Sequence, residues 1–81
     1  MKIKVLFFAN CSEIAGCKET EIRVVEGATV GDLKYGLLDQ YPDLANLQNV
    51  LSVAVNADYA DDWTVLHDGD EVALIPPVSG G

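Results

Sequence analysis

The chain has 81 residues, enough for one small domain, and 49% of them are hydrophobic, so a packed core is expected without a disulfide framework. Five basic residues against 13 acidic ones give a formal net charge of −8, which argues against partners such as nucleic acid and anionic membranes. An acidic surface of this kind suits basic partner proteins, although it serves solubility equally well.

No apolar stretch approaches the length that spans a membrane. The apolar run at 5–9 is too short for the hydrophobic region of a signal peptide, so a cytoplasmic protein is expected. Cys11 and Cys17 should then be reduced thiols, and their spacing fits no metal-ligand pattern. We interpret both as structural or incidental residues, and we predict no metal site.

The first predicted strand covers residues 2–9, where the chain alternates between two faces. One face is purely apolar and is assigned to the core. The other changes from charged to apolar along its length, which leaves Leu6 and Phe8 in need of cover. The residues of the core face are Ile3, Val5 and Phe7.

A loop and a second strand follow. Residues 10–17 are predicted as a loop with one helical turn at 12–15, and Gly16 ends that turn. The second strand is predicted at 19–25. The turn residues Glu26-Gly27 then lead toward the helix.

The sequence predicts one long helix. Thr29 is a good N-cap, and Asp32 at the third helical position suits a capping box. Gly36 inside the helix lowers helix stability by about 1 kcal/mol relative to alanine, but it allows close packing on a sheet. Pro42 ends the helix at or before Tyr41. The apolar stripe consists of Val30, Leu33, Leu37, Leu38 and Tyr41.

The second half of the chain is predicted to be mostly strand. A short helical turn at 43–48 precedes a third strand at 50–56, whose odd-numbered residues should face the core. Turn residues around Tyr59 are compatible with a very short edge strand, and a final strand is predicted at 72–75. We interpret Trp63 as a packing residue.

The predicted order is strand, strand, helix, strand, short strand, strand. One main helix on one face of a mixed sheet makes an α+β fold. A hairpin followed by a crossover helix and returning strands describes the ubiquitin-like β-grasp. We therefore predict a β-grasp domain over residues 1–75 and a flexible extended tail over 76–81.

The C-terminal segment combines several sequence features in succession: a turn, a strand, two prolines and two glycines. Two prolines remove two ladder donors and fix φ near the polyproline value, so the chain should leave the sheet stiff and extended. The six residues 76–81 can extend roughly 20 Å. A Gly-Gly end alone is typical of a frayed terminus, but turn, strand, prolines and glycines together favour a functional tail whose reactive group is the Gly81 carboxylate. The residues that would thread a narrow passage are Pro76, Pro77, Val78, Ser79 and Gly80.

The sequence contains no recognisable catalytic machinery. The three serines lack a neighbouring histidine, and His67 beside Asp68 is interpreted as a solvated turn residue. The paired aspartates lack calcium-loop spacing. We therefore do not expect an enzyme that acts on its own.

Four apolar residues are expected on the sheet face away from the helix. If the first and last strands are neighbours, Phe8 and Ile75 share that face with Leu6, and Tyr59 lies in the preceding turn. An exposed apolar patch marks a partner surface. Cover by the loop at 10–17 is an alternative for each residue singly and a weaker one for all four.

The last 13 residues carry a resemblance. The run Gly-Asp-Glu-Val-Ala-Leu-Ile-Pro-Pro-Val-Ser-Gly-Gly at 69–81 resembles the characteristic ending of the molybdopterin synthase small-subunit family. The similarity covers the chain, including residues 5–9, Glu13, Gly16 and 54–56. The thiamin-pathway sulfur carriers share the fold and the Gly-Gly end but not the Pro-Pro-Val-Ser lead-in, which is the most specific element.

The resemblance implies a sulfur carrier without a bound cofactor. A ubiquitin-activating-enzyme-like adenylyltransferase would join the Gly81 carboxylate to AMP, and a sulfurtransferase system would convert the acyl-adenylate to a thiocarboxylate. Within the large catalytic subunit, the sulfur would pass to cyclic pyranopterin monophosphate to build the dithiolene of molybdopterin. The same resemblance implies that Phe8, Tyr59 and Ile75 face the large subunit in a heterotetramer.

Three alternatives remain open. The chain is compatible with a sulfur carrier for thiamin, cysteine or tRNA thiolation, with a protein modifier joined to lysines through Gly81, and with a β-grasp interaction module whose tail is inert. The first two alternatives differ in the acceptor, and the third has none. Four residues lie outside the family pattern, namely Cys11, Cys17, Gly36 and Trp63.

Overall fold

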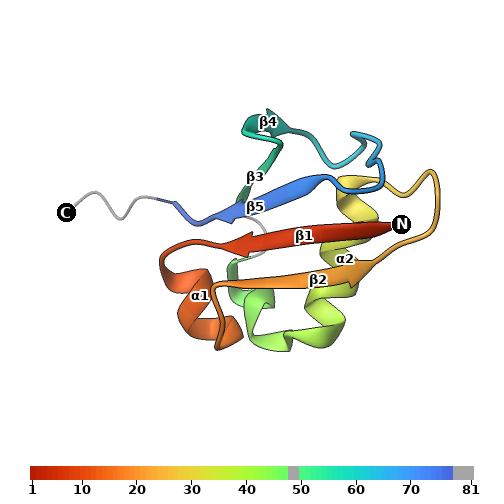
Figure 1. Ribbon diagram of the computed structural model, residues 1–81. Coiled ribbons are helices and arrows are strands. Elements are labelled where there is room, and N and C mark those ends of the chain that lie inside the picture. The colour runs from red at the N-terminus through yellow and green to blue at the C-terminus, as the bar shows by residue number, and fades with distance from the viewer. Residues whose placement is uncertain (48–49, 78–81) are drawn as a thin grey trace.

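The computed structural model describes residues 1–47 and 50–77, which form one mixed sheet of five strands with helices on one side (Figure 1). Gln48, the last residue of a predicted turn, and the tail residues 78–81 lie outside the described ranges. The elements are β1 (Lys2–Phe7), α1 (Asn10–Ala15), β2 (Glu19–Arg23), α2 (Val30–Gln40), the 3-10 helix η1 (Pro42–Leu47), β3 (Ser52–Val55), β4 (Asp58–Ala60) and β5 (Glu71–Ile75).

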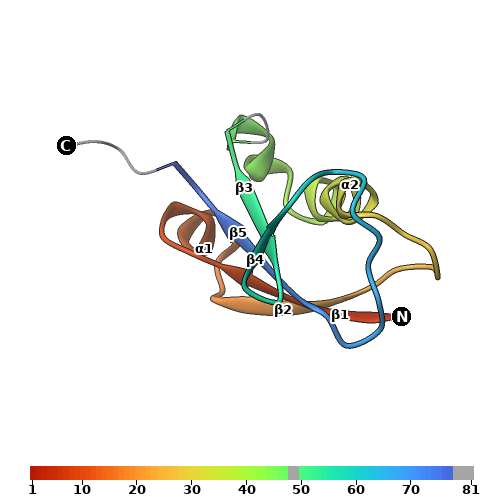
Figure 2. The same cartoon turned by 90° about the horizontal axis from the view of Figure 1, so that it is seen from above.

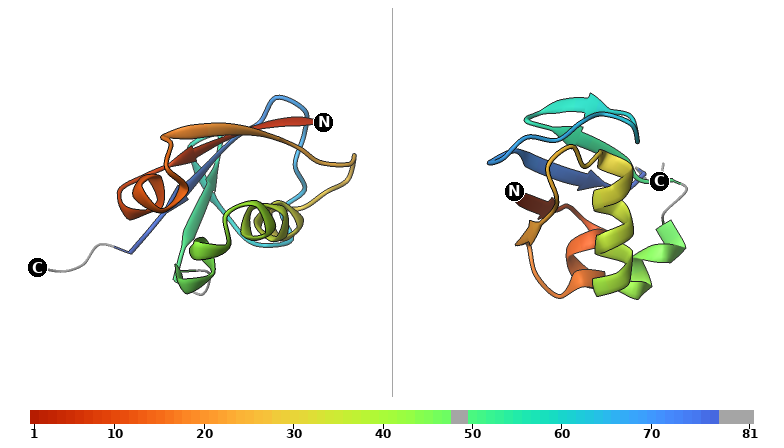
Figure 3. Two further views of the ribbon diagram at one scale, coloured as in Figure 1. Left: turned by 90° about the horizontal axis from the view of Figure 1, so that it is seen from below. Right: turned by 90° about the vertical axis from the view of Figure 1, so that its right-hand side faces the viewer.

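The strand order is β2-β1-β5-β3-β4. The first and last strands pair in parallel, and the other three pairings are antiparallel. The views in Figure 2 and Figure 3 show α2 crossing one face of this sheet and the chain leaving β5 at the end opposite the N-terminus. The predicted β-grasp topology is confirmed.

The core fills the space between α2 and the inner face of the sheet. The face of β1 that the alternation assigned to the core is buried, as are the helix residues Val30, Leu33 and Leu37. Leu44 of η1 is also buried, so this short helix closes one end of the core. The ring of Tyr41 meets the ring of Phe7 edge-on, with centroids 5.4 Å apart.

The ends of α2 follow the prediction. The Thr29 side chain accepts a hydrogen bond from the Asp32 backbone N–H, and the Asp32 carboxylate accepts one from the Thr29 N–H at 3.0 Å. The helix ends at Gln40, directly before Tyr41. A Cβ at Gly36 would lie 3.3 Å from the Ile22 Cδ1 atom, so the glycine lets α2 approach β2 closely.

The first strand is shorter than predicted, and the helix after it is longer. The backbone turns at Ala9, whose φ is 48°, and the Cys11 N–H donates to the Phe8 carbonyl at 3.0 Å. This tight turn starts α1 at Asn10 and brings Cys11 into the core, where a loop was expected. Gly16 ends α1 with φ 78°, as predicted.

Two other strands also have different limits from those predicted. β2 ends at Arg23, and β3 begins at Ser52 because the Leu51 N–H donates to the Leu47 carbonyl instead of joining the ladder. β3 ends before Asn56, where φ is 50° and the chain turns into β4. The short edge strand around Tyr59 is present.

Trp63 does not pack in the core. Its side chain is 76% exposed, so the interpretation of Trp63 as a packing residue is wrong. Ala54 differs in the opposite sense, because it lies on the outer face as expected but is only 6% exposed. It lies between Ala73 and Tyr59 in the sheet, so both neighbouring strands flank its single methyl group.

Replacement of Ala57 by glycine should stabilise the domain. Asn56 and Ala57 form the two-residue loop between β3 and β4, and the φ of Ala57 is 72°, a region that costs an alanine about 1–2 kcal/mol. Glycine removes this strain but adds about 0.5–1 kcal/mol of chain entropy in the unfolded state. We expect a net gain of roughly 0.5–1 kcal/mol in the free energy of unfolding, measured by urea denaturation followed by circular dichroism. The matched control is Ala60→Gly in β4, which should destabilise; a lower midpoint for Ala57→Gly would contradict the strain argument.

Candidate functional site

The site is built by the parallel pairing of β1 with β5. Leu6 stands opposite Ala73, and the Phe8 N–H still donates to the Leu74 carbonyl at 3.2 Å, one residue beyond the end of β1. The register therefore places Phe8 beside Ile75, both on the face away from α2. Two residues that are far apart in the sequence, Phe8 and Ile75, therefore lie side by side where the tail leaves the sheet.

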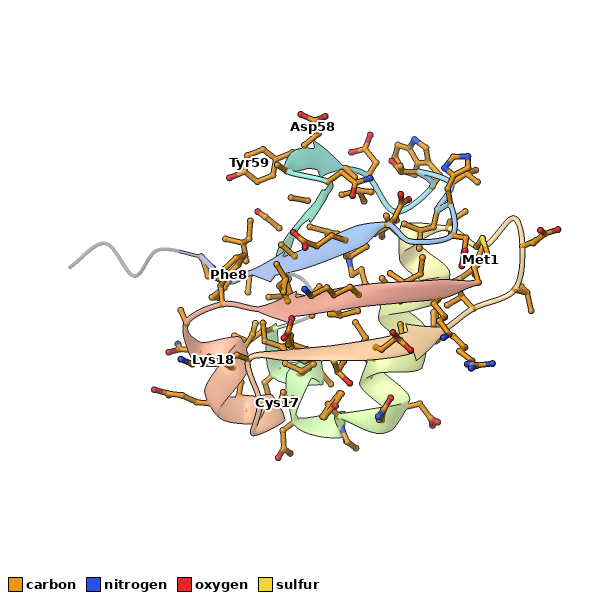
Figure 4. All side chains as sticks on the ribbon, viewed as in Figure 1. Met1, Phe8, Cys17, Lys18, Asp58 and Tyr59 are labelled. Atoms are coloured by element: carbon orange, nitrogen blue, oxygen red, sulfur yellow. The ribbon has the colours of Figure 1, made fainter. Side chains whose placement is uncertain are left out.

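The same face continues across the sheet to β4. Ala73 is opposite Ala54 in β3, and Ala54 is opposite Tyr59 in β4. Phe8 is 46% exposed and Tyr59 is 79% exposed, and Figure 4 shows both on the side of the molecule from which the tail emerges. We call this surface the outer patch; it consists of Leu6, Phe8, Ala54, Tyr59, Ala73 and Ile75.

The structure brings all four predicted interface residues onto the outer patch. Leu6 and Ile75 are half-buried, so the most exposed contributions come from Phe8 and Tyr59. Their role in binding a partner stays a prediction. Ala54 and Ala73 were not predicted as part of this surface: alternation along a strand assigns them to the outer face, but the register between strands is what places them beside the other four residues.

The last described residues show how the tail leaves the sheet. Ile75 is opposite Ser52 in the final pair of the β3–β5 ladder. Pro76 is buried and Pro77 is exposed, so the proline after β5 still belongs to the packed body of the domain. The predictions for Val78, Ser79, Gly80 and Gly81 concern residues outside the described ranges.

Charged residues border the outer patch on the β1–β2 side. The Lys4 ammonium lies 3.1 Å from a carboxylate oxygen of Glu19. This hydrogen bond, together with the negative charge of Glu19, raises the pKa of Lys4 above its ordinary value. Both side chains are about half exposed, so the pair contributes little to stability and can rearrange when a partner binds.

A hollow of about 350 Å³ lies beside Phe8, and Leu6, Ser12 and Lys18 contribute to its lining. Its lining is mostly apolar, and two residues of opposite charge, Lys18 and Glu19, also contribute to it. An apolar side chain would fit such a hollow. The chemistry of the site is thus that of a docking surface.

The two cysteines have different environments. Cys11 is fully buried in the core, and burial raises the pKa of its thiol. Cys17 is half-buried, with its sulfur 3.9 Å from the Tyr41 hydroxyl. Both are free thiols, and within residues 1–47 and 50–77 no group of three potential ligands is placed to hold a metal ion.

The acidic turn before β5 has a structural role. The Asp68 carboxylate accepts a hydrogen bond from the Lys2 N–H at 2.7 Å. Asp70 accepts one from the His67 N–H at 2.8 Å and one from the Asn56 side-chain amide at 2.9 Å. These bonds join the starts of β1 and β5 to the β3–β4 loop, and the His67 side chain is exposed, as predicted.

Among residues 1–47 and 50–77, no helix is long and apolar enough to cross a membrane.

Known proteins resemble this chain over its whole length. The ThiS family profile matches residues 5–81. A molybdopterin synthase sulfur carrier subunit from Chlamydomonas reinhardtii is 41% identical over 83 residues, which cover 100% of both chains. The crystal structure of SAMP1 from Haloferax volcanii matches with a TM-score of 0.91 and 31% identity over 100% of both chains. A complex of subunits 1 and 2 of the molybdopterin-converting factor from Helicobacter pylori contains a chain that matches with a TM-score of 0.73 and 28% identity, again over 100% of both chains. The predicted ubiquitin-like fold is confirmed.

The two thiols should differ in reactivity. A Cys17→Ser variant keeps only the buried Cys11, which should react with a disulfide reagent at pH 8 at least roughly tenfold more slowly than Cys17 does in the Cys11→Ser variant. Two causes act together: Cys11 is inaccessible, and its raised pKa leaves less thiolate at a given pH. The measurement is the rate of reagent release, with urea-unfolded protein as the control in which both rates converge. Equal rates in the folded variants would show that Cys11 is not buried.

Proposed function

The chain belongs to the ThiS family, and from that premise we propose that it is the sulfur carrier subunit of a molybdopterin synthase and acts in molybdenum cofactor biosynthesis. The observation that carries the proposal is the similarity over the full length to relatives with this name, which includes the C-terminal residues. The outer patch beside the departing tail supports it, because a carrier needs a surface that places its tail in a partner. In this proposal the domain is a non-catalytic subunit, and its partners supply the catalytic groups.

The proposed chemistry takes place at the terminal carboxylate. A carboxylate is a poor electrophile, so an oxygen of the Gly81 carboxylate first attacks the α-phosphate of ATP and releases pyrophosphate. A sulfide-level sulfur nucleophile then adds to the carbonyl carbon of the acyl-adenylate and displaces AMP, which takes the original oxygen with it. The product is a thiocarboxylate on Gly81. Cys11 and Cys17 play no part in this exchange.

The geometry of the domain limits where the acceptor can be. The tail is held at the buried Pro76, and the five residues from Pro77 to Gly81 can span roughly 17 Å when extended. The reacting carbon must therefore enter an active site within that distance of the outer patch. Prolines stiffen the base of the tail, and the glycines Gly80 and Gly81 add no side chain to a narrow passage.

Two partners are proposed to use the same tail in turn. The first is an adenylyltransferase related to ubiquitin-activating enzymes, which activates Gly81. The second is the large catalytic subunit, where the thiocarboxylate donates sulfur to cyclic pyranopterin monophosphate. The matched complex from Helicobacter pylori, between subunits 1 and 2 of the molybdopterin-converting factor, supports such a partner. We place these steps in the cytoplasm, with the carriers at the two ends of a heterotetramer.

A protein modifier is the second candidate function. It is favoured by the likeness to SAMP1, which a second structure names small archaeal modifier protein 1. In that case the activated Gly81 would form an amide with a lysine of another protein. Adducts between this chain and lysines of other proteins would select the modifier, whereas a sulfur-bearing carboxylate passed to a large subunit selects the carrier.

Charge introduced into the outer patch should prevent binding of the large subunit without unfolding the domain. Phe8 is 46% exposed and Ile75 is half-buried, so Phe8→Asp or Ile75→Asp is tolerated in the free domain but places an unpaired carboxylate in the complex, at a cost of several kcal/mol. Circular dichroism should show a folded protein, and calorimetry should show loss of binding. The matched control is Val25→Asp, an exposed residue in the turn before α2, which should bind normally. An unfolded Phe8→Asp domain would show that the assignment of the outer face is wrong.

The length of the tail should be critical for activation. Deletion of Gly81 moves the reacting carbon back by about 3.5 Å, and roughly 1 Å of misplacement can cost 100-fold in rate. One residue added after Gly81 converts the reactive carboxylate into an amide. After incubation with the adenylating enzyme, ATP and a sulfur donor, the intact mass of the wild type should show one oxygen-to-sulfur exchange. Neither altered form should show it, whereas Gly81→Ala should be slowed but active. Equal activation of the extended form, without trimming, would favour the inert-tail module.

A further inference from the structure

The end of the domain opposite the tail carries a second surface with aromatic side chains. Here the segment before β5 runs alongside the start of α2: the Val30 N–H donates to the Thr64 carbonyl at 2.9 Å, and the Gly31 N–H donates to the Asp62 carbonyl at 2.7 Å. Figure 3, right, looks onto this end. Trp63 follows Asp62 and is 76% exposed, although its backbone neighbours are firmly held.

A hollow of about 650 Å³ lies between α2 and this segment. Its apolar part is formed by Leu38 and Leu51, and the ring of Tyr35, which is 81% exposed, stands at its edge. Two carboxylates, Asp32 and Asp62, face it. An apolar floor, an aromatic edge and carboxylates suit the long stem and charged head of a lysine or arginine side chain.

Acidic residues outnumber basic residues at this end of the domain. Residues 24–32 and 61–70 contain no lysine or arginine but carry Glu26, Asp32, Asp61, Asp62, Asp68 and Asp70, which are six of the 13 acidic residues. The Lys34 ammonium, which lines the hollow, is already paired with Asp62 at 3.0 Å. Lys2 at the start of β1 and its neighbour Arg23 at the end of β2 also lie toward this end, whereas Lys4 and Lys18 lie farther along the two strands. Three basic residues thus stand against six acidic ones, and the acidic surplus suits a partner of positive charge.

We propose that the hollow lined by Tyr35 and Asp62, together with the exposed Trp63 that follows Asp62 in the chain, is a second docking site for a basic segment of a partner protein. The segment presents a lysine or arginine to the hollow and an apolar side chain to Trp63. The acidic surround disfavours a second copy of this chain, because both copies would carry the same charge. The starts of β1 and β5 lie at this end and the tail leaves at the other, so this site stays accessible while the outer patch is occupied.

Trp63 is the single tryptophan of the chain, so its fluorescence reports on binding at this surface. The probe is a synthetic peptide of alternating arginine and leucine, and the control peptide has glutamine in place of arginine. The arginine peptide should shift the Trp63 emission to shorter wavelength in a saturable and salt-sensitive manner. Tyr35→Ala and Asp62→Asn should each weaken binding by roughly threefold to tenfold. Phe8→Asp, which disables the outer patch, should bind the peptide like the wild type, so failure of this proposal is distinct from failure of the proposed function.

Four results would overturn the proposal: no saturable shift with the arginine peptide, equal binding of the glutamine peptide, full binding by Tyr35→Ala, or loss of binding in Phe8→Asp. A shift that appears when the protein alone is concentrated would instead identify a second copy as the occupant, and would also overturn it. Circular dichroism of each variant keeps these outcomes separate from unfolding, since Tyr35 is exposed and the Asp62 side chain is bonded to Lys34 at the surface.

Discussion

The parallel pairing of β1 with β5 is the constraint on which the structure depends. It joins the first and last strands at the centre of the sheet, sets Phe8 beside Ile75, and gives the tail its point of departure. Because these contacts link the two ends of the chain, the outer patch exists only once the whole domain has folded. A carrier that is built in this way presents its tail only when its docking surface is complete. The hydrogen bonds of Asp68 and Asp70 act at the other end of the same strands and hold their starts together.

Features that depend on residues close together in the sequence were predicted well. Thr29 and Asp32 are three positions apart and form their cap within one helical turn, and Pro42 follows directly on the helix. The alternation along β1 sorted the core from the outer face, because a strand reverses its side chains at every step. Leu6 on this strand and Phe8 directly after it could therefore be recognised as candidate interface residues before their partners in space were known.

The errors come from contacts that local patterns do not contain. The turn at Ala9 has a backbone conformation that its sequence does not favour, and it is held by the packing of Cys11 in the core. Trp63 was interpreted as a packing residue, but the hydrogen bonds of 62–66 with the start of α2 fix the backbone and leave the indole exposed. Ala54 and Ala73 joined the surface only through the register between strands, which is a tertiary property.

The two edges of the sheet have a consequence for how this domain meets other chains. β4 is only three residues long, and the outer face of β2 presents Glu19, Glu21 and Arg23 in succession. Short or highly charged edges are poor templates for an added strand, and they protect a protein with exposed apolar surface against edge-to-edge aggregation. Recognition is thereby directed to the faces of the sheet and to side-chain shape, so a domain this small can display Phe8 and Tyr59 in the open without propagating into fibres.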